Sequence, residues 1–251
     1  MPFTETPPRS FPSASVVARA AAALIGSVLV GVALALIWLA RLSTDRVLYV
    51  SGLGADGEPT AGAFEIALVL LALGGFCVAA AARGLRATAP VLRAWTPALS
   101  IVIASALFLL ASQVPCTAGC PLPVGDTFSW QDLVHTTAAV LAFALAAVAM
   151  LQTSFVDGRR VLRTLSLGAG ISTAVVAAAG GLLSLLRFRT DVGSILELVA
   201  TTIGMGWLMI LGFAISHASA LDAAQEQHGV VRKERGADRI RSARHPLVFA
   251  R

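Results

Sequence analysis

Long apolar runs separated by short polar segments set the pattern of this sequence. A helix needs roughly 20 apolar residues to cross a hydrocarbon core about 30 Å thick, and six runs are long enough. They are Val16–Ala40, Phe64–Ala82, Trp95–Val114, Leu133–Gln152, Leu165–Leu186 and Ile195–Ile215. The short alternating segments typical of a membrane β-barrel are not visible. The pattern therefore predicts an all-α, polytopic integral membrane protein built as a six-transmembrane-helix bundle.

Composition leads to the same class. Hydrophobic residues make up 57% of the 251 residues and charged residues only 13%, with a mean hydropathy of +0.80. A soluble domain of this length could not bury so much apolar surface. The first run follows Arg9 and Arg19, but it is far longer than the roughly 7–15 apolar residues of a signal peptide. We expect it to be retained as the first helix.

Basic residues in the connections predict the orientation, because cytoplasmic segments carry an excess of Lys and Arg. Four of the 19 basic residues, Arg41, Arg46, Arg187 and Arg189, fall on one side of the predicted bundle, and 15 fall on the other. With six spans, both termini are expected in the cytoplasm. The predicted organisation is a disordered cytoplasmic leader over 1–15, a transmembrane domain over 16–219, and a basic cytoplasmic tail over 220–251. Nothing in the tail is a nucleic-acid-binding motif.

The connection between the third and fourth runs contains two cysteines in QVPCTAGCPLP. Cys116 and Cys120 lie on the predicted extracytoplasmic side, where a disulfide is the usual state of two nearby cysteines. Their C-x-x-x-C spacing differs from the C-x-x-C of redox-active pairs. We expect a structural disulfide. Cys77 lies within the second run and is interpreted as a packing residue.

Ionisable residues near the outer ends of the helices are the candidate site. Such groups are costly at membrane depth unless they are paired or face a wet cavity. Asp132 and His135 share one face of the fourth helix, and Thr201 and Gly204 share a stripe of the sixth with an acidic residue. We hypothesise that five residues converge on one polar pocket below the first outer loop. They are Glu65, Asp132, His135, Arg187 and Glu197. The alternative is that each reaches the interface separately.

Two stretches, YVSGLGADGEPTAGAF and DLVHTTAAVLAF, resemble the bacterial domain-of-unknown-function-998 family. The resemblance covers roughly residues 16–219, and it implies a six-helix protein of the bacterial cytoplasmic membrane without implying an activity. A more remote similarity to Frag1-type membrane proteins suggests lipid-related roles.

Two functions remain open at this point. The first is a non-enzymatic protein that binds a lipid headgroup or a small polar ligand in an outward-facing pocket, or that supports a partner protein. The alternative is a metal-dependent lipid hydrolase, since Ser129, Asp132 and His135 resemble part of the ceramidase-like ligand set. A catalytic zinc normally needs three protein ligands, and His217 lies at the opposite membrane face. Two histidines at one depth, as bis-histidine haem requires, are likewise missing, and no charged stripe indicates a channel. We therefore expect no metal and no cofactor, with membrane lipids as the first partners.

Overall fold

The computed structural model describes the backbone of residues 14–157 and 160–243, and the side chains up to residue 225. Three short 3-10 helices lie in the connections: η1 (Ser51–Gly54), η2 (Val91–Arg93) and η3 (Gly125–Thr127). The α-helices are α1 (Ala14–Leu42), α2 (Ala61–Ala81), α3 (Pro97–Gln113), α4 (Trp130–Ser154), α5 (Arg160–Leu185) and α6 (Thr190–Ala243). The described residues contain no strand, so the all-α class and the six-helix bundle are confirmed.

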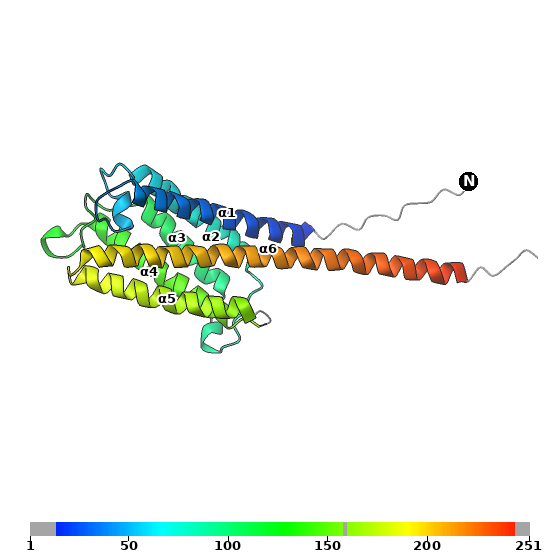
Figure 1. Ribbon diagram of the computed structural model, residues 1–251. Coiled ribbons are helices and arrows are strands. Elements are labelled where there is room, and N and C mark those ends of the chain that lie inside the picture. The colour runs from blue at the N-terminus through cyan, green and yellow to red at the C-terminus, as the bar shows by residue number, and fades with distance from the viewer. Residues whose placement is uncertain (1–13, 158–159, 244–251) are drawn as a thin grey trace, which may run out of the picture.

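The helices alternate in direction along the bundle (Figure 1), and their contacts make a closed ring. Each helix packs against its neighbours in the chain, and α6 closes the ring against α1. The α1–α2, α3–α4 and α5–α6 connections gather at one end, which we call the disulfide end. The α2–α3 and α4–α5 connections lie at the other, which we call the tail end. Residues far apart in the sequence therefore meet at each end of the bundle.

Five helices are long and apolar enough to cross a membrane, and α3 is a shorter apolar helix of 17 residues. Local chemistry sets the limits of α3. The side chain of Thr96 accepts a hydrogen bond from the Leu99 backbone N–H, and Pro97 occupies the first turn, where its missing N–H costs nothing. At about 1.5 Å per residue, α3 is about 26 Å long, close to the thickness of the hydrocarbon core. The chain is a multi-pass membrane protein.

The last helix is longer than the predicted sixth span. α6 begins at Thr190 and continues to Ala243, and only Thr190–Gln225 is a candidate span. Its 54 residues correspond to about 80 Å of helix, so it extends well past the other helices at the tail end (Figure 1). Much of the predicted tail is therefore helical. Residues 1–13 of the predicted leader and 244–251 of the tail lie outside the described residues.

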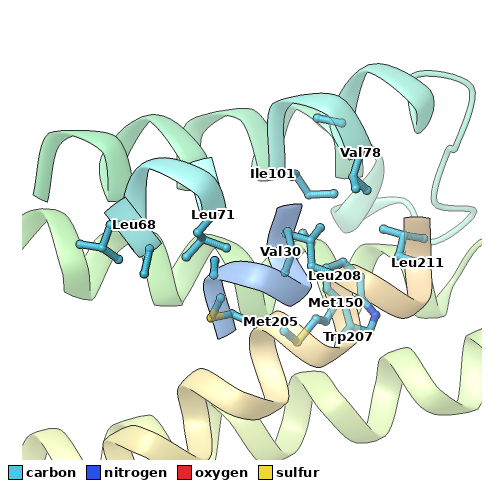
Figure 2. Close-up of a cluster of buried hydrophobic side chains, with 14 of the residues drawn as sticks. Val30, Leu68, Leu71, Val78, Ile101, Met150, Met205, Trp207, Leu208 and Leu211 are labelled. Atoms are coloured by element: carbon cyan, nitrogen blue, oxygen red, sulfur yellow. The ribbon is translucent and has the colours of Figure 1, made fainter. Parts of the chain in front are cut away.

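Small residues bring α1, α2 and α6 close together. A Cβ atom added to Gly26 of α1 would lie 2.7 Å from the carbonyl oxygen of Gly74 in α2. One added to Gly212 of α6 would lie 2.9 Å from the Ala23 carbonyl oxygen. Van der Waals packing of this kind stabilises helix pairs in lipid, where the hydrophobic effect between helices is lost. The buried apolar side chains inside the ring, among them Val30, form the core (Figure 2).

Candidate functional site

Asp132 lies in the first turn of α4, and its carboxylate is hydrogen-bonded to the loop before the helix. Ser129 is the N-cap residue of α4, and its hydroxyl oxygen accepts a hydrogen bond from the Asp132 backbone N–H. The fully buried Asp132 carboxylate accepts from the Ser129 hydroxyl at 2.5 Å, and from the backbone N–H and the hydroxyl of Thr117, both at 2.8 Å. The Ser129 hydroxyl thus caps the helix as in a capping box, whereas the Asp132 carboxylate accepts from the Ser129 hydroxyl and not from its backbone N–H. The network joins the α3–α4 connection to the start of α4.

His135, one turn further along α4, is hydrogen-bonded to backbone carbonyl groups at the C-terminal end of α3. Its Nδ1 lies 3.0 Å from the carbonyl oxygen of Ala111 and 2.8 Å from that of Val114. In a continuing helix, the Ala111 carbonyl would accept from the residue four positions on, but that residue is Pro115, which has no N–H. Because both partners of Nδ1 are acceptors, Nδ1 must carry the hydrogen. In the neutral ring, Nε2 is therefore left with a free lone pair.

Cys116 and Cys120 are joined by a disulfide, as predicted. The Cys116 backbone carbonyl accepts from the Asp56 N–H at 2.9 Å, so the same loop is also tied to the α1–α2 connection. Gln131 strengthens the tie, because its side-chain amide donates to the Asp56 carboxylate and to the Pro115 carbonyl. The disulfide end is thus a cap in which two connections and the start of α4 are hydrogen-bonded together.

A cavity of about 80 Å³ lies inside the ring beneath this cap. By the same measure a single water needs only about 10–15 Å³. Helices α1, α2, α3, α4 and α6 contribute to its wall, together with η1. Most of the lining side chains are apolar, and Phe108 and Phe143 form an edge-to-face pair with ring centroids 5.6 Å apart. The polar lining residues are Ser51, Ser105, His135, Glu197 and Thr201.

Glu197 of α6 brings a carboxylate to this wall. It is partly buried, and it accepts hydrogen bonds from the Val50 N–H at 2.8 Å and the Ser51 N–H at 3.3 Å. In the described part of the chain, ion pairs are formed by Arg46 with Glu58 and by Arg189 with Asp191, and none involves Glu197. Glu197 is therefore an acidic group on a mostly apolar cavity, and no cationic side chain among the described residues is paired to it.

The structure brings two of the five candidate residues to the cavity. His135 and Glu197 both line it, and Thr201 and Gly204 of the predicted α6 stripe line it as well. Asp132 is buried one helical turn before His135, but its carboxylate is hydrogen-bonded to Thr117 and Ser129 and does not line the cavity. Glu65 and Arg187 are exposed and do not line the cavity. Arg187 has a positive φ of 50° just after the end of α5, where the chain turns toward α6.

Sequence reasoning did not identify the rest of the wall. Phe64, Phe108 and Phe143 sit in runs that are apolar on every side, so nothing in the residue pattern distinguishes a cavity-facing residue from a lipid-facing one. The backbone N–H groups that meet Glu197 belong to a connection nearly 150 residues earlier in the chain. The Ser-x-x-Asp pattern at residues 129–132 is a usable signal for the N-cap of α4.

The comparisons with known proteins agree with the architecture. A family model described as "Protein of unknown function (DUF998)" matches residues 24–214, which is most of the chain. This match confirms the resemblance carried by the first connection and by the start of α4. No curated protein and no solved structure matches the chain.

Proposed function

We propose that this chain, which belongs to the DUF998 family, binds an amphipathic lipid in the cavity beneath the cap. The apolar part of the lipid would lie among the aromatic and aliphatic side chains, and its polar head would meet Glu197 and His135. The observation that carries the proposal is Glu197, a carboxylate on an apolar cavity with no ion pair in the described part of the chain.

The energetics favour a head that donates hydrogen bonds or carries positive charge. An ionisable group at membrane depth costs on the order of 2.5–3.5 kcal/mol unless it is paired or solvated. The two backbone N–H donors of Val50 and Ser51 offset part of this cost, and a ligand ammonium or hydroxyl would offset more. In the neutral ring, His135 offers the Nε2 lone pair, a second acceptor. An amine- or hydroxyl-bearing lipid therefore fits this end better than a head that presents only phosphate.

The test is native mass spectrometry of the protein released from lipid nanodiscs that contain an aminophospholipid. We expect wild-type protein to retain lipid, and Glu197→Gln to lose most of it. Glu65→Gln is the matched control, because it makes the same change at an exposed glutamate outside the cavity. Equal retention by the two variants would contradict the role of Glu197.

A second pair of variants tests the cavity itself. Ala139 lines it one turn after His135, whereas Ala144 on the same helix is exposed. Ala139→Phe should fill the space and displace the lipid, while Ala144→Phe should leave binding unchanged. If Ala139→Phe retains as much lipid as wild type, the lipid lies on the outer surface of the bundle and the proposal is wrong.

We further propose that the disulfide end faces outward in a bacterial cytoplasmic membrane, so that the cavity lies near the outer leaflet. The support is the distribution of the basic residues: Arg19, Arg83, Arg86 and Arg93 lie at or near the tail end, together with the basic residues of the tail. Fusions of a fluorescent reporter and of alkaline phosphatase to the C-terminus test this orientation. A phosphatase-active, non-fluorescent C-terminus would reverse it.

A further inference from the structure

The disulfide has a histidine beside it. The Sγ atoms of Cys116 and Cys120 and a ring nitrogen of His135 all lie within 4.8 Å of one another. Cysteine thiolate and neutral imidazole are the preferred ligands of zinc. While the disulfide is intact, its sulfur atoms are not thiolates and do not serve as such ligands. The three groups together are therefore three of the four ligands of a tetrahedral zinc site, and the S–S bond keeps that site from forming.

We propose that reduction of this disulfide converts Cys116, Cys120 and His135 into a Cys₂His site for a zinc-class divalent cation. The inference does not depend on lipid binding, because Cys116 and Cys120 belong to the cap and do not line the apolar cavity. His135 is shared, since it also lines the cavity. It assigns the chain a redox-dependent metal site with three protein ligands, leaving the fourth tetrahedral position for water or another ligand.

The hydrogen bonds of His135 favour a tautomer and a ring orientation that suit a metal ligand. A metal-binding histidine usually donates its other ring N–H to a carbonyl or carboxylate, which fixes the tautomer and the ring orientation. His135 Nδ1 does so with the carbonyl groups of Ala111 and Val114. Nε2 is then the nitrogen with the lone pair that a metal requires.

The cap would hold the ligands together after the S–S bond is broken. The Cys116 carbonyl is bonded to the Asp56 N–H, and both the N–H and the hydroxyl of Thr117 are bonded to Asp132. These contacts do not involve sulfur, so they fix the backbone around Cys116 in either redox state. Cys120 is held as well, because its backbone N–H donates to the Thr117 carbonyl at 2.8 Å, a contact that does not involve sulfur either.

Reduction of the Cys116–Cys120 disulfide needs an external dithiol. Cys116 is fully buried and Cys120 is partly exposed, so an incoming thiolate attacks the Cys120 sulfur and Cys116 leaves as the thiolate. The second thiol of the dithiol then releases Cys120 and becomes part of a disulfide itself. The protein gains two electrons and two protons, and a binding Zn²⁺ displaces the two thiol protons.

The test uses the full-length protein in detergent, with and without prior reduction, under anaerobic conditions. After Zn²⁺ is added and excess metal is removed, we expect one zinc per reduced chain and none per oxidised chain. Co²⁺ in place of Zn²⁺ should give thiolate-to-cobalt charge-transfer bands and the spectrum of a tetrahedral ion in the reduced chain only. This comparison needs no substitution, so a folding defect cannot mimic the result.

Variants then assign the ligands. Reduced C116S/C120S should bind no zinc, whereas reduced Cys77→Ser should bind as wild type does, because Cys77 lies in α2 away from the cap. His135→Gln should weaken binding by more than about tenfold, since loss of an outer partner alone costs that much. The proposal is overturned if reduced wild-type protein binds no zinc, or if C116S/C120S binds as much as wild type.

Discussion

Two carboxylates toward the disulfide end, Asp132 and Glu197, meet their surroundings in opposite ways. Asp132 is fully buried, and the hydrogen bonds of its carboxylate come from Thr117 and Ser129 of the connection before α4. Glu197 is partly buried, accepts from two backbone N–H groups, and faces a cavity. The hydrogen-bonding capacity of the Asp132 carboxylate is therefore mostly taken up by contacts within the fold. The Glu197 carboxylate still has acceptor capacity on the side of the cavity.

The difference shows that an ionisable residue at a helix end is not a functional signal by itself. Asp132 offers about four lone-pair positions, and three donors already occupy the side chain. It stabilises a loop, and its burial follows from that role. Glu197 accepts from two backbone N–H groups and lines the cavity, and its remaining acceptor capacity on that side is what points to a ligand.

The largest effect we expect is on stability, from Asp132→Ala. The Thr117 N–H, the Thr117 hydroxyl and the Ser129 hydroxyl would lose a charged acceptor, and each such bond contributes about 1.5–3 kcal/mol. Because these losses are not additive, we expect the free energy of unfolding to fall by on the order of 3 kcal/mol. Thermal unfolding in detergent, followed by tryptophan fluorescence, measures it.

The matched comparison is Glu197→Gln. The glutamine side chain still accepts from Val50 or Ser51, and it removes a charge from a mostly apolar wall, so we expect stability within about 1 kcal/mol of wild type. A loss in Glu197→Gln as large as that in Asp132→Ala would show that both carboxylates are structural. The distinction between them, and the main support for the ligand, would then disappear.

The sequence was sufficient for the architecture because hydrophobic length is a direct physical requirement of the bilayer. The six runs correspond to α1 to α6. Where the limits differ, local chemistry explains the difference. Thr96 and Pro97 start α3 two residues after the apolar run begins. In contrast, α6 continues past Ile215 because no proline occurs in its polar continuation before Ala243, and the two glycines there, Gly229 and Gly236, lie within the helix.

The candidate site was less accessible to sequence reasoning. The pattern places His135 and Glu197 at similar depth, but it does not give the rotation of each helix about its axis, which packing decides. The close contacts at Gly26, Gly74 and Gly212 fix that rotation for α1, α2 and α6. The exposure of Glu65 on α2 follows from the same packing, whereas Arg187 is exposed because it lies in the turn after α5.

The smaller effect we expect is from removing the disulfide, and it tests whether the Asp132 network or the S–S bond holds the cap. The bridge closes a loop with a sequence separation of only 4, and the chain-entropy relation gives about 2 kcal/mol for so short a loop. Under non-reducing conditions, C116S/C120S should therefore lose less stability than Asp132→Ala in the same unfolding measurement, and Cys77→Ser serves as the cysteine control. The backbone bonds from Asp56 and Asp132 remain in the double variant, so His135 should still complete the end of α3. If the double variant is less stable than Asp132→Ala, the hydrogen bonds of the Asp132 carboxylate to Thr117 and Ser129 depend on the disulfide. The contrast between a structural Asp132 and a ligand-binding Glu197 would then not hold.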